Sequence, residues 1–89
     1  SITIGELDAQ GKGYGTDAIA TAVRQAFEEL GFNRLSASIL ATNARSIRAF
    51  EKAGFKREGV RRQAYLWHGA FQDQVALGIL REEHTPRPR

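Results

Sequence analysis

The sequence predicts a mixed α/β fold whose elements follow the order β-α-β-α-β-β. Residues 1–7 and 35–40 alternate apolar and polar side chains, as strands with one buried face do. A segment with helical spacing separates them, and a strand, a helix and a strand in that order predict two parallel strands. Two further alternating runs, residues 60–67 and 71–80, predict a hairpin at the end of the sheet.

The first helix is expected from about Tyr14 to Leu30. Its apolar residues recur at the spacing of one helical face; they are Ile19, Ala22, Val23, Ala26, Phe27 and Leu30. Gly31 follows directly and suits the left-handed cap that ends many helices.

The second helix is expected from about Ala44 to Ala53, with Asn43 as its N-cap and Gly54 as its stop. Ile47, Phe50 and Ala53 share its inward face, and Phe55 follows as a core anchor. In the hairpin, His68 and Gly69 form the expected two-residue turn, which makes His68 a surface residue. Glu51-Lys52 is expected to form a charged outer face, and Asp73 is expected in the hairpin.

Length and composition exclude several classes of protein. The chain has 89 residues, 42% of them hydrophobic, which is enough for one modest core. It contains no cysteine, so thiol redox chemistry and thiolate zinc sites are excluded, and its two distant histidines predict no metal site. No apolar run approaches the roughly 18 to 20 residues of a membrane span. We therefore expect a cytoplasmic protein with no membrane partner.

The net charge of +3 raises the alternative of a small nucleic-acid-binding module. Basic residues cluster at Lys56-Arg57, at Arg61-Arg62 and in the tail with Arg81, Arg87 and Arg89. Elsewhere the two signs are interspersed, which favours a solvated basic face that helps an anionic cofactor. A nucleic-acid partner is therefore not expected.

The segment from Gln10 to Thr16 lies between a strand and a helix and contains three glycines. Glycines allow close approach to a ligand, and the first turn of a helix has free amide groups that favour a phosphate. Lys12 is followed by Gly13 rather than Ser or Thr, and Thr16 stands where a dinucleotide fingerprint needs glycine, so neither common phosphate motif fits. A simple connecting turn remains the alternative.

Two stretches resemble the GNAT acyltransferase superfamily. IGELDAQGKGYGTDAI contains the pattern Q/R-x-x-G-x-G/A, with Gln10, Gly13 and Gly15 in the signature positions. NARSIRAFEKAGFKREG, residues 43–59, resembles the branch that includes the ribosomal-protein alanine acetyltransferases. The resemblance implies a partial GNAT domain over residues 1–81, the acetyl-CoA-binding half, and a flexible tail over 82–89. In that family the last strand inserts between the second and third.

The resemblance also implies where acetyl-CoA binds. Amides of residues 11–16 would hold the pyrophosphate, and the pantetheine arm would lie between diverging strands at residues 4–7 and 38–40. Asn43 would contact that arm, a role compatible with capping the helix. Arg45 and Arg48 are candidates for the 3′-phosphate, although a solvated helix face is the alternative. The implied cofactor-binding residues are Leu7, Gln10, Gly11, Lys12, Gly13, Tyr14, Gly15, Thr16, Asn43 and Arg48.

Ser46 is the candidate catalytic residue, because the resemblance places it where an acid protonates the departing thiolate. A capping interaction with Asn43 is the alternative. The expected activity is transfer of an acetyl group to a primary amine of a protein N-terminus, an amino sugar or a polyamine. The alternative is a CoA-binding or assembly module without turnover.

The family fold has further elements before the strand that carries IGEL, so we expect a fragment whose catalytic base cannot be assigned. An unpaired first strand would promote association, which predicts a homo-oligomer.

Overall fold

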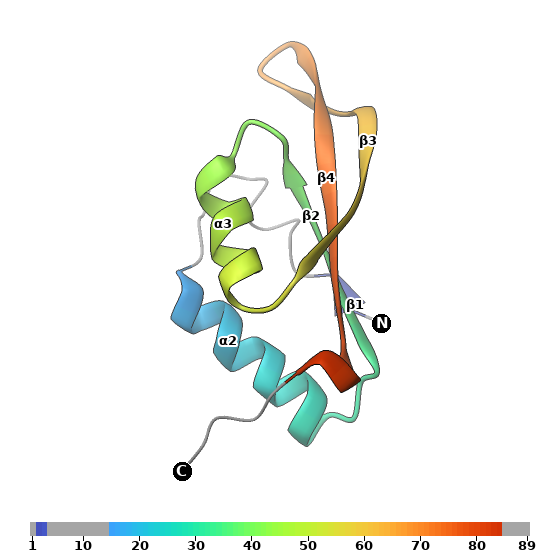
Figure 1. Ribbon diagram of the computed structural model, residues 1–89. Coiled ribbons are helices and arrows are strands. Elements are labelled where there is room, and N and C mark those ends of the chain that lie inside the picture. Colours follow the sequence, from blue (N-terminus) through green and yellow to red (C-terminus); the bar gives the residue numbers. More distant parts are fainter. Residues whose placement is uncertain (1, 4–14, 85–89) are drawn as a thin grey trace.

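The computed structural model describes residues 2–3 and 15–84, which form one mixed sheet with two helices on one face (Figure 1). The order of strands in the sheet is β1-β2-β4-β3. The elements are β1 (Ile2–Thr3), α2 (Thr16–Arg24), η2 (Gln25–Glu29), β2 (Arg34–Leu40), α3 (Ala44–Lys52), β3 (Lys56–Trp67), β4 (Ala70–Leu80) and η3 (Arg81–Glu83).

The strand pairing agrees with the predicted topology. β1 and β2 are parallel, with Ile2 opposite Leu35. β4 is antiparallel to both β2 and β3 and lies between them, which confirms the expected insertion of the last strand. The expected divergence of the first two strands concerns residues outside the described ranges.

The core lies between the sheet and the two helices. Leu35, Ala37 and Ile39 of β2 stand opposite Ile79, Leu77 and Val75 of β4, and all six side chains are buried. Alternate residues of a strand point to opposite faces, so this register puts all six on the helix side. The helices cover them with buried side chains: Ile19, Val23, Ala26, Phe27, Ile47 and Phe50.

The first helix ends differently from the prediction. It begins at Thr16 after Gly15, and its last turn is the π-helix η2, closed by a hydrogen bond of 2.9 Å from Leu30 N to Gln25 O. A π turn contains more residues than an α turn and rotates the following side chain off the helical face. Leu30 is therefore 67% exposed and does not share the buried face of the apolar residues before it, contrary to the expected helical spacing. Gly31 has φ +72°, as expected for the cap.

The second helix agrees closely with its prediction. It spans Ala44–Lys52, Asn43 is its N-cap, and Gly54 follows with φ +108°. Ile47, Phe50 and Phe55 are almost fully buried, and the Phe50 and Phe55 rings meet edge to face with centroids 5.1 Å apart. The helix thus anchors its own C-terminal turn in the core.

The hairpin is longer than predicted because β3 already begins at Lys56. His68 and Gly69 form its turn with positive φ angles of 50° and 77°, the backbone of a tight hairpin turn. His68 is exposed, as expected. Figure 1 shows that the tip of the hairpin extends beyond the end of α3.

The start of the expected flexible tail is ordered. Residues 81–83 form η3, and the Leu80 N–H donates to Glu83 Oε1 at 2.9 Å. His84 Nε2 lies 2.8 Å from Glu28 Oε2, and its ring is 5.5 Å from the Phe27 ring. Residues 82–84 therefore have defined contacts, and flexibility of the tail over residues 82–89 stays a prediction. Residues 85–89 lie outside the described ranges.

Candidate functional site

The N-terminus of α2 is the described part of the expected phosphate site. Gly15 caps the helix in an extended conformation, φ −72° and ψ 162°, without a capping side chain. The first intrahelical hydrogen bond runs from Ile19 N to Gly15 O at 3.2 Å. The amide groups of residues 16–18, in the first turn of the helix, therefore have no intrahelical acceptor. Gly15 is exposed, and a Cβ there would meet nothing within 4 Å. This end of α2 is open to an anion.

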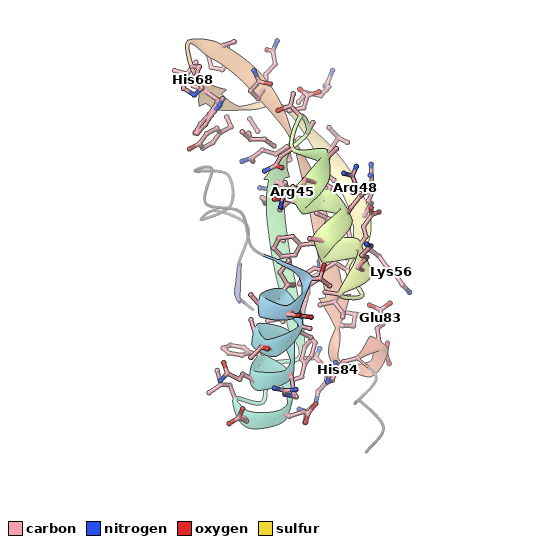
Figure 2. All side chains as sticks on the ribbon, turned by 90° about the vertical axis from the view of Figure 1, so that its left-hand side faces the viewer. Arg45, Arg48, Lys56, His68, Glu83 and His84 are labelled. Atoms are coloured by element: carbon pink, nitrogen blue, oxygen red, sulfur yellow. The ribbon has the colours of Figure 1, made fainter. Side chains whose placement is uncertain are left out.

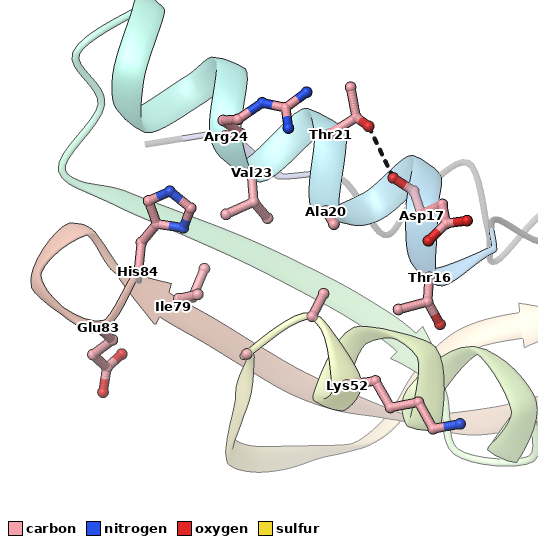
Figure 3. Close-up of a pocket in the computed structure, with 12 residues that line it drawn as sticks. Thr16, Asp17, Ala20, Thr21, Val23, Arg24, Lys52, Ile79, Glu83 and His84 are labelled. Atoms are coloured by element: carbon pink, nitrogen blue, oxygen red, sulfur yellow. Dashed lines mark hydrogen bonds between the residues drawn. The ribbon is translucent and has the colours of Figure 1, made fainter. Parts of the chain in front are cut away.

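A groove of about 480 Å³ begins at this helix end (Figure 3). One side of it is formed by α2, from Thr16 to Arg24, and the other by residues 52–54 at the end of α3. Ile79 lies at its floor, and Glu83 and His84 close it at the far end. Lys52 extends along α3 on the side where Thr16 lies. The groove therefore combines a helix N-terminus and Lys52, which favour phosphate, with the carboxylates of Asp17 and Glu83.

Asn43 and Ser46 lie together at the N-terminus of α3. The Ser46 N–H donates to Asn43 Oδ1 at 3.3 Å, which confirms the capping geometry. Ser46 is only 4% exposed, and it is the buried polar residue of the described chain. Its hydroxyl makes no hydrogen bond to any part of the chain that the structure describes. A buried hydroxyl normally has a hydrogen-bond partner, and the described residues provide none for this one.

The two arginines of α3 lie on different sides of the helix (Figure 2). The Glu51 carboxylate binds Arg57 Nε of β3 at 3.1 Å, so Glu51 is on the side of α3 toward β3. Arg48 is three residues before Glu51 and therefore lies on the same side of the helix. Arg48 does not line the groove beside α2, whereas Lys52 does. Cofactor binding by Arg48 stays a prediction, whereas Lys52, expected on a charged outer face, lines the groove.

Asp73 holds two backbone segments in place. Its carboxylate accepts from the Gln63 N–H at 2.9 Å, and its carbonyl accepts from the Ala41 N–H at 2.8 Å. The irregular β3 segment that Asp73 holds had no signal in the sequence, because residues 60–67 follow the strand pattern without a break.

Six of the predicted cofactor residues lie outside the described ranges; they are Leu7, Gln10, Gly11, Lys12, Gly13 and Tyr14. Of the remaining residues, Gly15 and Thr16 lie at the start of α2, and Asn43 and Ser46 at the start of α3. Across residues 2–3 and 15–84, no cluster of three metal-ligating side chains is found. None of the helices described is long and apolar enough to cross a membrane.

Comparisons with known proteins place the chain in a family. The model of the acetyltransferase (GNAT) domain matches residues 1–56, which include the residues before α2, Asn43 and Ser46. The probable N-acetyltransferase YjcK of Bacillus subtilis is 40% identical over 70 residues, covering 79% of this chain and 39% of that protein. An N-acetyltransferase derived from the SPbeta prophage of the same organism is 35% identical over 74 residues. The match covers 83% of this chain and 42% of that protein.

Solved structures give the same result. A GNAT acetyltransferase from Bacillus anthracis is 28% identical with a TM-score of 0.76, over 91% of this chain and 51% of that one. The spermidine N-acetyltransferase of Vibrio cholerae, in complex with CoA and spermine, is 25% identical with a TM-score of 0.75. The match covers 85% of this chain and 45% of that one.

The chain spans about two fifths of the length of the curated relatives named above. Its sheet order, its two helices and its sequence match over residues 1–56 all agree with one family. The chain belongs to the GNAT acetyltransferase family.

Proposed function

We propose that the chain is the acetyl-CoA-binding half of an N-acetyltransferase that transfers the acetyl group to a primary amine. The observation that carries this proposal is the pair of helix N-termini within the family-matched segment. One has free amides beside a groove with Lys52, and the other holds the buried Ser46 hydroxyl. The first suits the phosphates of CoA, and the second suits its thioester end.

In the proposed reaction the lone pair of the amine attacks the carbonyl carbon of the thioester. The tetrahedral intermediate collapses with cleavage of the C–S bond, and the thiolate receives a proton from Ser46 or from water. The amine loses a proton to water or to a base outside this chain. Protein N-termini, amino sugars and polyamines are the acceptor classes we propose, and the ribosomal-protein branch stays a prediction.

A melting experiment with CoA tests the binding step. CoA at about 100 times its dissociation constant should stabilise the chain by roughly 2.7 kcal/mol. Gly13→Val should abolish this shift, because a β-branched side chain blocks close approach to the pyrophosphate, while α2 can still pack. Absence of a shift at millimolar CoA, in both the unmutated chain and the variant, would show that the loop is only a turn.

Ser46→Ala separates binding from chemistry. The variant should bind CoA as tightly as the unmutated chain but release thiol more slowly with an amine acceptor. If CoA binds and no amine in a panel leads to thiol release, the second candidate holds, a CoA-binding or assembly module without turnover.

The cation for the 3′-phosphate is tested by comparing CoA with 3′-dephospho-CoA. If Lys52 contacts that phosphate, Lys52→Gln should weaken binding of CoA and leave binding of the dephospho form unchanged. Arg48→Gln is the matched comparison, and the reverse pattern would restore the assignment made from the sequence.

Self-association is also proposed. A dodecameric structure is known for the related spermidine N-acetyltransferase of Vibrio cholerae. In this chain Leu66 and Phe71 are paired across the hairpin and are 60% and 64% exposed, which supports an interface there. A cytoplasmic location stays a prediction.

A further inference from the structure

The hairpin has two faces, and the register of β3 with β4 assigns its side chains to them. Val75 of β4 is in the core, so the even-numbered residues of β4 are on the face opposite the helices. Tyr65 pairs with Gln72, and Trp67 pairs with Ala70. Both aromatic side chains are therefore on that opposite face. Figure 1 shows that the two helices lie on the other side of the sheet.

Tyr65 and Trp67 form an aromatic pair on this face. Their ring centroids are 6.1 Å apart, and the planes are tilted by 34°. The His68 ring meets the Trp67 ring edge to face, with centroids 4.7 Å apart. Both members of the pair are half-buried, and neither belongs to the hydrophobic core. A partner that stacks on these rings would bury aromatic surface that the core does not use.

The charge beside the aromatic pair is positive. Residues 59–72 contain two arginines and no aspartate or glutamate. Arg61 pairs with an even-numbered residue of β4, so it shares the face of the aromatic pair, and it is exposed. It has no ion pair within the part of the chain that the structure describes. The register puts Asp73 on the helix side, and Glu58 of β3 already binds Arg34.

Aromatic rings beside an arginine are the combination that binds single-stranded nucleic acid. Bases stack on the rings, and the guanidinium group contacts a phosphate. The amide side chains of Gln72 and Gln74 are on the same face and offer donors and acceptors to base edges. The bases of a duplex are stacked on one another, so this face suits a single strand. Interspersed charges along the sequence argued against such a partner, but they do not describe how charges and rings are distributed over the two faces.

We propose that the face of the hairpin formed by Tyr65, Trp67 and Arg61 binds single-stranded nucleic acid. Stacking and phosphate contacts are common to RNA and DNA, so the assignment is to the single strand and not to one sugar. This binding function goes beyond acetyl transfer and does not depend on it.

Trp67 is the one tryptophan of the chain, so its fluorescence reports directly on this face. The chain is titrated at low salt with oligouridine and with oligothymidine of about ten nucleotides, a length within the range that such surfaces cover. Both should quench the fluorescence, because a base that stacks on the indole ring reduces its emission. A duplex of the same length should not quench it. Quenching by either single strand supports the proposal, and a preference between them identifies the kind of strand.

Variants locate the binding by the anisotropy of a labelled oligonucleotide. Tyr65→Ala should weaken binding at least about fivefold, the lower end of what one stacked base contributes, and Tyr65→Phe should retain it. Arg61→Gln should weaken binding and reduce the slope of log affinity against log salt by about 0.7. Arg62→Gln is the matched control with a smaller effect, because Arg62 lines the pocket beside the Asp73 carboxylate.

Three results would overturn the proposal: no quenching by either strand, equal binding of the duplex, or full affinity in Tyr65→Ala. Displacement of the oligonucleotide by CoA would also overturn it, because the strand would then occupy the cofactor site. The melting shift with CoA is recorded on the same samples and shows that each variant is folded. Absence of that shift in the unmutated chain refutes the proposed function and leaves this inference unaffected.

Discussion

Gly54 and Gly78 lack a side chain for different physical reasons. Gly54 has φ +108°, which L-residues avoid, and a Cβ there would lie 3.0 Å from Ile79 Cδ1 in the core. Gly78 is not among the residues with positive φ, but a Cβ there would lie 2.7 Å from both Arg34 Nη2 and Glu58 Oε1. Gly78 thus leaves room for an ion pair that crosses β4, and the hydrogen bond within that pair raises the pKa of Arg34.

Alanine at these two glycines should give different losses of stability. Gly54→Ala should lower the free energy of unfolding by about 1 to 2 kcal/mol, because the strained backbone cannot relax. Gly78→Ala displaces only the ends of two flexible, half-exposed side chains. Its cost of up to about 1 kcal/mol is offset by the gain of about 0.5 to 1 kcal/mol from replacing glycine within a strand. Urea unfolding of both variants measures the difference, and equal losses would contradict this account.

At the scale of the element, residues 62–64 of β3 form a bulge opposite Asp73, which attaches it to the turn before α3. The Asp73 carboxylate accepts from the Gln63 N–H, and its carbonyl accepts from the Ala41 N–H. A local change at Asp73 should therefore alter the geometry of the bulge without altering the groove between α2 and residues 52–54.

Asp73→Ala should leave the Gln63 N–H without its acceptor and release the bulge. We expect a loss of about 1 kcal/mol in stability and an unchanged melting shift with CoA. Asp73→Asn keeps an oxygen acceptor in the same place and should restore most of the stability. If the alanine variant is as stable as the unmutated chain, the hydrogen bond does not hold the bulge.

The last element, η3, should make stability depend on pH. Lys56 Nζ lies 2.6 Å from Glu83 Oε2. This hydrogen bond, together with the one from the Leu80 N–H, lowers the pKa of Glu83 below its ordinary value of 4.5, and Glu83 in turn raises the pKa of Lys56 above 10.5. Because the pKa of the Glu83 carboxyl is lower in the folded state, the ion pair stabilises the fold at pH values above the unfolded pKa. This stabilisation is lost as the pH falls through the folded pKa. Because the pKa of Lys56 is higher in the folded state, its contribution to stability is complete at pH values below the unfolded pKa. That contribution is lost as the pH rises through the folded pKa.

Glu83→Gln should therefore be less stable than the unmutated chain near neutral pH and equally stable in acid. Urea unfolding at about pH 7 and at about pH 3 measures the two differences. Glu82→Gln is the matched control, because Glu82 is exposed and its carboxylate has no ion pair within the described ranges. A deficit of the Glu83 variant that persists unchanged at low pH would refute the role of its charge.

At the scale of the whole molecule, the helices cover one face of the sheet and the hairpin extends beyond them (Figure 1). The molecule is accordingly elongated, with extents of 46 × 20 × 18 Å. Val60, Leu66 and Phe71 are large apolar residues of this hairpin that are more than half exposed. Exposed apolar surface of this kind favours association.

We expect the isolated chain to associate rather than to remain a stable monomer. Light scattering during size exclusion should give a mass above 9.9 kDa, the mass of one chain. Replacing Leu66 and Phe71 with serine should shift the mass toward the monomer without loss of the sheet, because neither side chain is in the core. A monodisperse monomer with a cooperative melting transition would overturn this expectation.

Periodicity and local chemistry determined much of the fold. The spacing of Ile47 and Phe50, the cap at Asn43 and the glycines at 31 and 54 act within one or two helical turns, so the sequence alone was sufficient to predict the helices. The same holds for the His68-Gly69 turn. The resemblance of residues 10–15 and 43–59 to GNAT motifs supplied the family and the order of the strands, since motifs carry information that periodicity lacks.

Only the tertiary structure decided the features that depend on segments distant in sequence. The π turn rotates Leu30 away from the face on which its helical spacing placed it, and His84 lies against Phe27 and Glu28. Likewise, nothing in residues 60–67 reveals that Asp73 holds a bulge there, or that Lys52 lies in a groove with Thr16. The physical reason is that these features result from packing and hydrogen bonds between elements, whereas sequence patterns report only what each element does by itself.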